Sequence, residues 1–126
     1  MSHRKANILT YKAGAAISRG QAVKFGADKE HVVKSAGNTD MNIGIAQNDA
    51  AAAEDLVEVA GIGGGAVALA KENISMGKLL VANADGSLEQ TNASGDRVIA
   101  MAMEDAVAGD LFAVDVVMGL ATKADA

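Results

Sequence analysis

Short segments of this chain alternate hydrophobic and polar positions. Between Asp55 and Ala60, Val57 and Val59 face one way and Glu58 faces the other, which is the period-two pattern of a half-buried strand. Turn-forming stretches rich in Gly, Asp and Asn separate such segments about every 8 to 12 residues, a spacing typical of a sandwich or barrel. The pattern predicts an all-β chain, with strands at residues 21–25, 31–35, 42–46, 55–60, 65–70, 78–82, 87–91, 97–103 and 110–118.

The same pattern occurs twice. Ile17–Gly20 recurs as Ile74–Gly77, Asn42–Ala46 as Val98–Ala102, and Glu54–Val59 as Gly109–Val114. A chain of 126 residues buries roughly two-thirds of its unfolded surface, whereas either half would be marginal alone. We therefore expect one β-barrel or sandwich built from two similar halves. The expected limits are an N-terminal arm at 1–12, a domain at 13–121 with repeats at approximately 16–70 and 73–121, and a C-terminal tail at 122–126.

The apolar residues of the chain are small. Tryptophan is absent, and one tyrosine and two phenylalanines are the only aromatic residues. Aromatic side chains supply much of the buried area in an ordinary core. A chain without them either packs its layers closely or completes its burial against other subunits, and the second alternative favours a homo-oligomer.

Charge and cysteine content exclude several classes of protein. The net charge is −5, and the only basic cluster is His3–Lys5, so direct nucleic-acid binding is not expected. The absence of cysteine excludes disulfides and thiolate metal sites. The longest apolar run, Ala60–Ala70, is about half of a membrane span, and we expect no secretory signal because residues 1–25 contain no apolar run of seven or more. These features predict a protein made in a cytoplasm, without a membrane partner.

The N-terminal arm has two interpretations. It carries the basic pair Arg4 and Lys5, followed by Ile8, Leu9 and Tyr11 in a segment with strand character. Chain termini are commonly loosely tied. The alternative is an arm that lies on a neighbouring subunit, which makes these five residues the candidate contact site.

A glycine-rich segment, Gly61–Ala66, matches the dinucleotide-binding pattern, with Asp85 as a downstream acidic residue. That pattern needs a helix after the glycines, but Ala66–Ala70 alternates in size like a strand. The counterpart in the second repeat, Val117–Ala121, has lost the motif. We therefore expect a glycine-rich connection between strands and no cofactor.

Acidic residues and histidines offer little catalytic chemistry. The acidic groups lack the alternating spacing of a calcium loop, and Asp is common in turns because it bonds nearby backbone amides. These groups are Asp49, Glu54 and Asp55 in one half and Glu104, Asp105 and Asp110 in the other. His3 and His31 accompany no nucleophile-elbow motif. The sequence predicts no catalytic residue, no metal site and no enzymatic activity.

The repeated motifs resemble the small capsid cement (head decoration) proteins of tailed bacteriophages. The pattern is Ile-Ser-x-Gly, then Ile-Gly-Ile-Ala, then Asp-Leu-Val-x-Val running to a glycine, and it covers residues 16–25, 42–70, 73–82 and 98–120. The resemblance implies a β-barrel or sandwich on the outer surface of a virion capsid, where it bridges major capsid proteins. It also implies a homo-oligomer, with a trimer favoured and a dimer as the alternative.

Two other classes of function stay open. Biotinyl and lipoyl carrier domains also consist of two similar halves, and Lys71 lies near the junction where they carry a modified lysine. Its neighbours, Ala70 and Glu72, differ from the carrier signatures. The third class is a small enzyme that binds a nucleotide through Gly61–Ala66.

Overall fold

The computed structural model describes residues 7–37, 40–91 and 96–120. Within these ranges the chain contains strands and no helix, which confirms the predicted all-β fold. The strands are β1 (Ile8–Ala13), β2 (Ala22–Phe25), β3 (His31–Lys34), β4 (Asn42–Ala46), β5 (Leu56–Ala60), β6 (Gly65–Leu69), β7 (Leu79–Ala82), β8 (Leu88–Gln90), β9 (Arg97–Ala102) and β10 (Leu111–Leu120).

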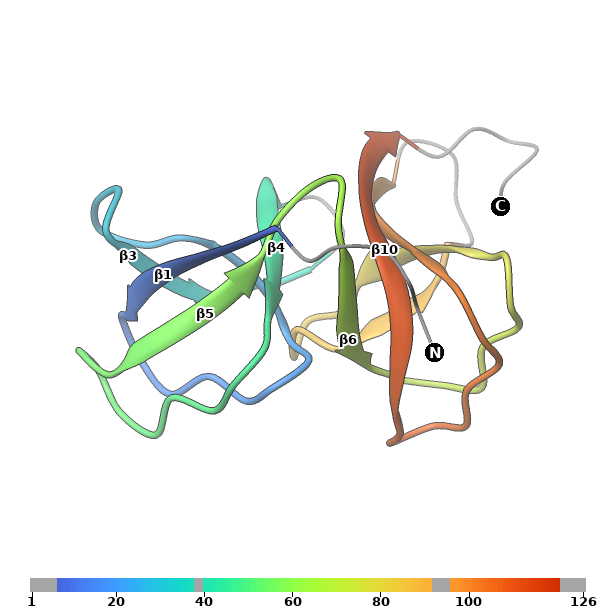
Figure 1. The fold of residues 1–126 in the computed structure, drawn as a ribbon, viewed down its shortest axis with the longest axis horizontal. Coiled ribbons are helices and arrows are strands. Elements are labelled where there is room, and N and C mark those ends of the chain that lie inside the picture. Colours follow the sequence, from blue (N-terminus) through green and yellow to red (C-terminus); the bar gives the residue numbers. More distant parts are fainter. Residues whose placement is uncertain (1–6, 38–39, 92–95, 121–126) are drawn as a thin grey trace.

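The first five strands form a closed barrel in the order β1-β3-β2-β4-β5. Neighbours run antiparallel except β1 and β3, which pair in parallel at Lys12 and Ala13. β1 also pairs with β5 from Ile8 to Lys12, and this pairing closes the barrel. Figure 1 shows the barrel at one end of the long axis of the molecule, with β1 and β5 crossing in front of it.

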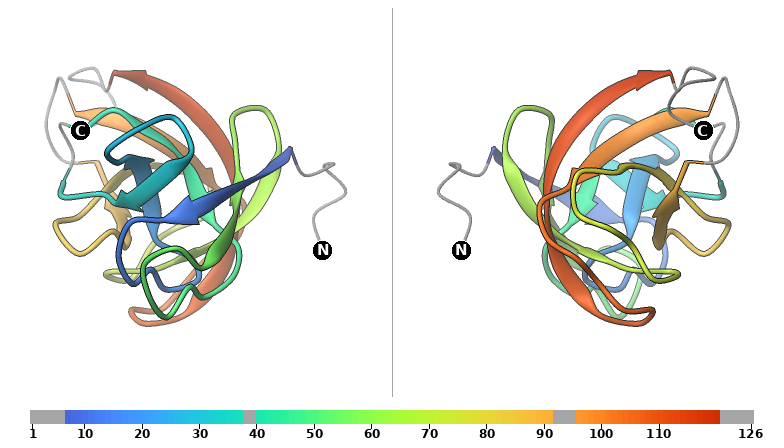
Figure 2. Two further views of the ribbon diagram at one scale, coloured as in Figure 1. Left: turned by 90° about the vertical axis from the view of Figure 1, so that its left-hand side faces the viewer. Right: turned by 90° about the vertical axis from the view of Figure 1, so that its right-hand side faces the viewer.

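The last five strands repeat this arrangement. They form a sheet in the order β6-β10-β9-β7-β8, which repeats every strand pairing of the first barrel except that between β1 and β3. The pairing that would close the second barrel is reduced to one parallel bridge between Ala70 and Leu88. Figure 2 shows the two halves from opposite ends of the molecule. Two similar halves are therefore confirmed, and both begin one strand earlier than the expected repeat limits, at β1 and β6.

The turns repeat as closely as the strands. Ile17 bridges to Ala50 in the first half, and Ile74 bridges to Ala106 in the second. The backbone N–H of Arg19 donates to Asp49 at 2.7 Å. In the second half the N–H of Met76 donates to Asp105 at 2.8 Å. The recurring Asp therefore fixes the turn that the Ile-Ser-x-Gly motif makes.

One hydrophobic core spans both halves. Ala22, Ile45 and Ala60 of the first barrel are fully buried among the core residues of the second half. A second cluster around Val23, Val32 and Val57 fills the first barrel. Because the side chains at the joint are small, the two sheets approach closely without aromatic residues. The two sheets consequently share one core.

Hydrogen bonds reinforce the joint between the halves. The side-chain amide of Gln47 donates to the carbonyl of Val67 at 3.1 Å and accepts from its N–H at 3.1 Å. This amide occupies the edge of β6 as a neighbouring strand would. Nearby, the N–H of Leu69 donates to the carbonyl of Gly20 at 3.0 Å, and the N–H of Ala22 donates to the carbonyl of Gly86 at 2.8 Å.

Candidate interaction surface

The candidate arm residues lie partly in the barrel. Ile8, Leu9 and Tyr11 belong to β1, which is paired with β5, so this stretch is a structural strand. Ile8 and Leu9 nevertheless leave 41% and 61% of their surface exposed. Tyr11 packs edge-on against Phe25, with ring centroids 6.0 Å apart. Arg4 and Lys5 lie outside the described residues.

A groove opens beside β1. Its volume is about 230 Å³, and it is lined by Thr10, Tyr11, Lys12, Lys29, Glu30 and Leu56. β1 pairs with β3 only from Lys12 onward, so the edge at Ile8 and Thr10 extends beyond β3. The groove therefore combines a strand edge, charged side chains and the exposed side chain of Leu56, which are features of a protein-binding surface more than of a catalytic pocket.

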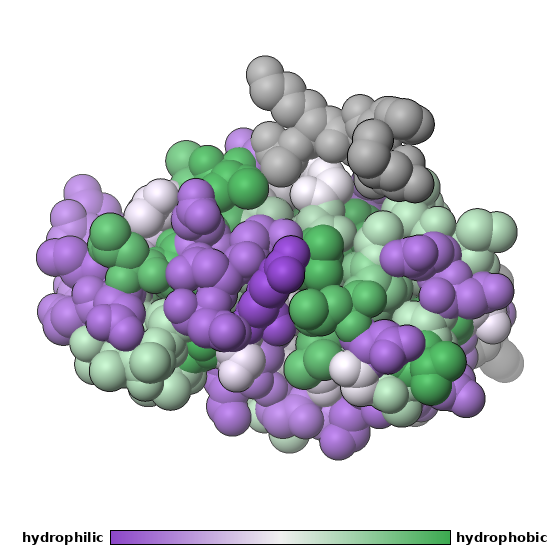
Figure 3. All heavy atoms as spheres, turned by 60° about the horizontal axis from the view of Figure 1, so that its bottom comes forward, coloured by the Kyte–Doolittle hydropathy of each residue, from purple (hydrophilic) through white to green (hydrophobic). Residues whose placement is uncertain are grey.

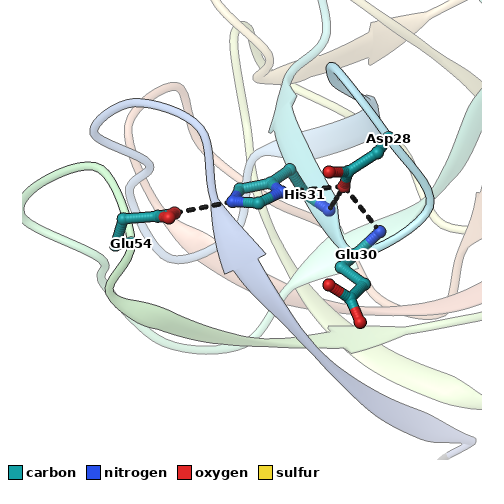
Figure 4. A network of polar contacts seen from close by, with 4 residues as sticks. All are labelled: Asp28, Glu30, His31 and Glu54. Atoms are coloured by element: carbon teal, nitrogen blue, oxygen red, sulfur yellow. Dashed lines mark hydrogen bonds and ion pairs between the residues drawn. The ribbon is translucent and has the colours of Figure 1, made fainter.

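The side chain of His31 joins two turns of the first barrel (Figure 4). Its Nδ1 lies 2.7 Å from a carboxylate oxygen of Asp28, and its Nε2 lies 2.6 Å from a carboxylate oxygen of Glu54. Asp28 also accepts hydrogen bonds from the backbone N–H groups of Glu30 and His31. His31 thus links the β2–β3 turn to the turn before β5.

The electrostatics of this network favour a charged imidazole. Hydrogen bonds to Asp28 and then Glu54 raise the pKa of His31 above its ordinary value of 6.5. The hydrogen bond from His31 in turn lowers the pKa of Asp28. An imidazolium between two carboxylates can hold the two turns together.

The backbone of Glu54 is unusual. Its φ of 76° is the only positive φ of a non-glycine residue in the described ranges. The equivalent residue of the second half is Gly109, whose φ is 90°. Glutamate therefore occupies a position whose positive φ costs glycine less conformational free energy than other residues. Its contact with His31 supplies a physical reason for this choice.

The second half carries a simpler version of the same turn. There Ser87 precedes Leu88, as His31 precedes Val32 in the first half. The Ser87 hydroxyl donates to Asp85 at 2.5 Å, and this contact lowers the pKa of Asp85. A serine is too short to reach beyond Asp85, so the second half has no counterpart of the Glu54 contact.

The glycine-rich segment connects two strands, as predicted. Gly61–Gly64 leads from β5 into β6, and Gly63 adopts a φ of 91° in the turn. The N–H of Gly63 donates to the carbonyl of Val116 at 2.9 Å. Phosphate binding by the dinucleotide motif requires a helix N-terminus after the glycines, and β6 occupies that place.

The acidic residues serve as turn caps. Asp49 and Asp105 bond the repeated Ile-Ser-x-Gly turns, and Asp55 accepts from the N–H of Ala52 at 3.1 Å. Glu104 accepts from the N–H of Ala113 at 2.7 Å. Within the described ranges, no three His, Asp or Glu side chains are grouped as metal ligands would be.

Lys71 follows β6 instead of projecting from a hairpin tip. Its ammonium group lies 3.6 Å from the carboxylate of Asp85, in the β7–β8 turn. A carrier lysine must be presented freely to its modifying enzyme, and this ion pair gives Lys71 a local role. Among the described residues there is also no helix with the length and hydropathy that crossing a membrane requires.

Exposed apolar side chains are spread over both halves. In Figure 3, which views the molecule from below, hydrophobic areas lie between hydrophilic ones, and one of them lies where the two halves meet. The most exposed large apolar side chains are Met41, Met76, Leu56, Leu9 and Val107, each more than 60% exposed.

Sequence reasoning missed the groove and the His31 network. A signal for the network was available, since Glu54 aligns with Gly109 in the repeat, and glycine commonly marks a positive φ. No comparable signal marks the groove, because its lining comes from three segments that are distant in the sequence.

Comparisons with known proteins agree with this architecture. The family model for phage cement proteins matches residues 3–120. Comparison with curated proteins finds no match. Among solved structures, the chain is similar to the N base of head fiber gp8.5 in bacteriophage phi29, with a TM-score of 0.69 and 18% sequence identity. That similarity covers 87% of this chain and 92% of the other, and it shows a shared fold.

The family match confirms the resemblance inferred from the repeated motifs. It extends over nearly the whole chain, including both halves of the fold. It supports a structural, capsid-associated role in a virion. The chain belongs to the phage cement protein family.

Proposed function

We propose that this protein binds the outer surface of a phage capsid and stabilises the lattice by bridging neighbouring major capsid proteins. The observation that carries the proposal is the match to the cement family over residues 3–120. The apolar side chains exposed on both halves support it, because a bridging protein needs more than one contact area. In this proposal the protein is made in the host cytoplasm and then joins the capsid.

The physical basis of stabilisation is mass action. A protein that binds the assembled lattice and not its dissociated subunits lowers the free energy of the lattice. At a free concentration 100 times the dissociation constant, each occupied site contributes about 2.7 kcal/mol. Repeated over many sites, this contribution raises the temperature and the internal pressure that the capsid withstands.

The proposal includes a homo-oligomer without catalytic activity. We favour a trimer over a dimer, with no cofactor, nucleic acid or membrane as partner. The two alternative functions have less support. A nucleotide-binding enzyme would need a helix where β6 follows Gly61–Gly64, and a carrier domain would need Lys71 free of its ion pair with Asp85.

The direct test uses decoration-free capsids of the cognate phage. Purified protein should sediment with these capsids, saturate a fixed number of sites and raise their melting temperature. Capsids of an unrelated phage serve as the control. Absence of binding to the cognate capsid would refute the proposed function.

A second test concerns the candidate arm, Arg4, Lys5, Ile8, Leu9 and Tyr11. Deleting residues 2–6 leaves β1 whole, whereas a deletion through Tyr11 would remove most of a barrel strand. We expect the short deletion to weaken capsid binding and to leave the melting temperature of the free protein unchanged. A matched deletion of the tail, residues 122–126, is the control. Full capsid binding after removal of residues 2–6 would exclude Arg4 and Lys5 as contacts.

A further inference from the structure

The contact between the two halves has a defined geometry. A turn of the first half, Gly20–Ala22, inserts against the second half. A Cβ atom on Gly20 would lie 2.6 Å from the N of Leu69 and 2.8 Å from a side-chain carbon of Leu111. Gly86 lies against Gln21, whose side-chain amide donates to the carbonyl of Asp85 at 2.7 Å. We call Gly20–Ala22 the inserted turn. The seat consists of Leu69, Gly86 and Leu111, which contact this turn, and of Val67, which lies on the same strand and bonds Gln47.

The first half carries an empty counterpart of the seat. The equivalents of the seat residues in the repeat are Thr10, Lys12, Lys29 and Leu56. All four line the groove of about 230 Å³ beside β1. In the second half this place is filled by the inserted turn, and in the first half it is open. The groove is therefore explained by the duplication, as the position that a turn like Gly20–Ala22 would fill.

The second half likewise carries an unused counterpart of the inserted turn, namely Gly77–Leu79. Gly77 has a φ of 87°, close to the 91° of Gly20. Gly20 is buried against the seat, whereas Gly77 is exposed and a Cβ added to it would have no atom within 4 Å. Two apolar side chains border this turn. These are Met76, which is 67% exposed, and Met103, which is 37% exposed and equivalent to Gln47.

We propose that the Gly77–Leu79 turn of one copy of this chain docks into the groove beside β1 of a second copy, repeating between chains the contact that joins the two halves within a chain. The occupant is a second copy because the chain already contains this turn bound to this kind of seat. The inference rests on the proposed homo-oligomer and names its contact surfaces.

The contact between chains differs from the internal one in its chemistry. In the seat, the N–H of Leu69 binds the carbonyl of Gly20, but the N–H of Lys12 already donates to Glu30 at 2.8 Å. Gly86 is replaced by Lys29, and Gln47 by Met103. The docked turn therefore bonds the strand edge at Ile8 and Thr10 and packs Met103 and Leu79 on apolar surface. Lys78, the equivalent of Gln21, meets the turn of Asp28, Lys29 and Glu30, in which two carboxylates outnumber one exposed ammonium group.

Such a contact joins two different surfaces and is therefore heterologous. Head-to-tail contacts generate a ring when the rotation closes and a filament when it does not. A ring of three chains would contain six similar barrels joined by alternating internal and external contacts. This arrangement agrees with the trimer favoured above.

Cysteine pairs test the docking directly, because the chain has no native cysteine. Thr10 and Met103 are equivalent to Val67 and Gln47, which bond each other across the internal joint. Thr10→Cys and Met103→Cys, each alone, should give no disulfide dimer under oxidation, because a heterologous contact does not place a residue opposite itself. The two single variants mixed together should give a disulfide heterodimer. Lys34→Cys, on the exposed end of β3, mixed with Met103→Cys is the control and should not cross-link.

A charge reversal provides a second measurement on the full-length chain. Lys78→Glu would place a carboxylate opposite Asp28 and Glu30, and we expect the dissociation constant of the oligomer to rise about tenfold. Lys34→Glu is the matched control, with no expected effect. Sedimentation velocity over a range of concentrations measures both, and circular dichroism checks the fold.

The outcomes separate this inference from the proposed function. An oligomer that forms without the Thr10–Met103 cross-link, and that Lys78→Glu does not weaken, overturns the docking and leaves capsid binding untouched. A chain that stays monomeric at millimolar concentration also overturns it. Cross-linking in a protein that fails to bind capsids would sustain the docking and refute the capsid role.

Discussion

The two barrels are built from the same repeat but end in different states. The first closes completely, because β1 pairs with both β3 and β5. In the second, a single bridge between Ala70 and Leu88 stands in the place of that closure, and the Gly20–Ala22 turn of the first half occupies the open side. The strands of the first half close their own barrel, whereas the second half is completed by a turn of the first half.

The strands that end the two halves, β5 and β10, also differ. β5 has 5 residues and ends at Ala60, where the chain enters the second half. β10 has 10 residues and continues along β9. The joint and the His31 network are two places where the halves differ. Paired substitutions at equivalent positions therefore test each half against the other.

The largest expected effect concerns Gly44 and its equivalent Ala100. Because the chain turns away after Ala60, a Cβ on Gly44 would lie 2.2 Å from the carbonyl oxygen of Ala60. In the second half β10 continues beyond Ala100, which pairs with Val116 just before the register of the two strands shifts. Gly44→Ala should lower the free energy of unfolding by about 3 kcal/mol. Urea denaturation followed by circular dichroism measures the change.

Gly61→Ala is the control for this substitution. The atoms nearest to a Cβ at Gly61 are 3.7 Å away, and its φ is not positive, so we expect a change within about 0.5 kcal/mol. Equal midpoints for Gly44→Ala and the unmodified protein would show that β4 and β5 can separate at no cost, contrary to the close approach described here.

Much of the fold follows from the sequence, because local chemistry determines it. Alternating apolar positions and turn residues predicted the strands, and the repeat predicted two similar halves. The comparison of Gly61–Ala66 with its counterpart in the repeat gave the correct interpretation of the glycines as a connection into a strand. Each of these inferences concerns residues that are near one another along the chain.

The joint and the groove depend instead on residues that are far apart in the chain. Gln47 and Val67 meet only because the halves pack in one particular way, and nothing in the local pattern fixes that packing. The role of Ile8–Tyr11 as a barrel strand was also hidden, because the segment β6 that repeats it has different side chains. The repeat limits were therefore placed too late by one strand.

The second prediction concerns Gln47 and its equivalent Met103. Gln47→Ala removes both hydrogen bonds to Val67 and those that its amide donates to Ile45 and Ala46. The N–H and the carbonyl of Val67 would then lack partners at the partly buried edge of β6. We expect this loss to lower the free energy of unfolding by about 2 kcal/mol. Met103→Ala should cost under about 0.5 kcal/mol in a dilute sample, because its side chain is exposed there. Similar losses for both variants would mean that the joint does not depend on the amide.

The third prediction compares Glu54 with Gly109. Gly109→Ala introduces a side chain at a φ of 90° with no atom within 4 Å of its Cβ, so backbone strain alone should cost about 1 kcal/mol. Glu54→Ala should be less stable than Glu54→Gly by a similar amount, since both lose the contact with His31 and only alanine keeps the strain. Thermal unfolding of the three variants and the unmodified protein measures these differences. A Gly109→Ala variant with the stability of the unmodified protein would argue against a strained turn.

The smallest expected effect is a pH dependence that belongs to the first barrel alone. Asp28 and Glu54 raise the pKa of His31 in the folded protein, so the stabilisation is fully present below about pH 6.5 and is lost as the pH rises through the folded pKa. The lowered pKa of Asp28 means that its own contribution is lost only as the pH falls through that lowered value. His31→Gln should therefore lower the melting temperature at about pH 5.5 and have little effect at about pH 9. Ser87→Ala, at the equivalent position, should have the same effect at both values. A His31→Gln deficit that persists unchanged at high pH would show that the imidazole acts through neutral hydrogen bonds and not through its charge.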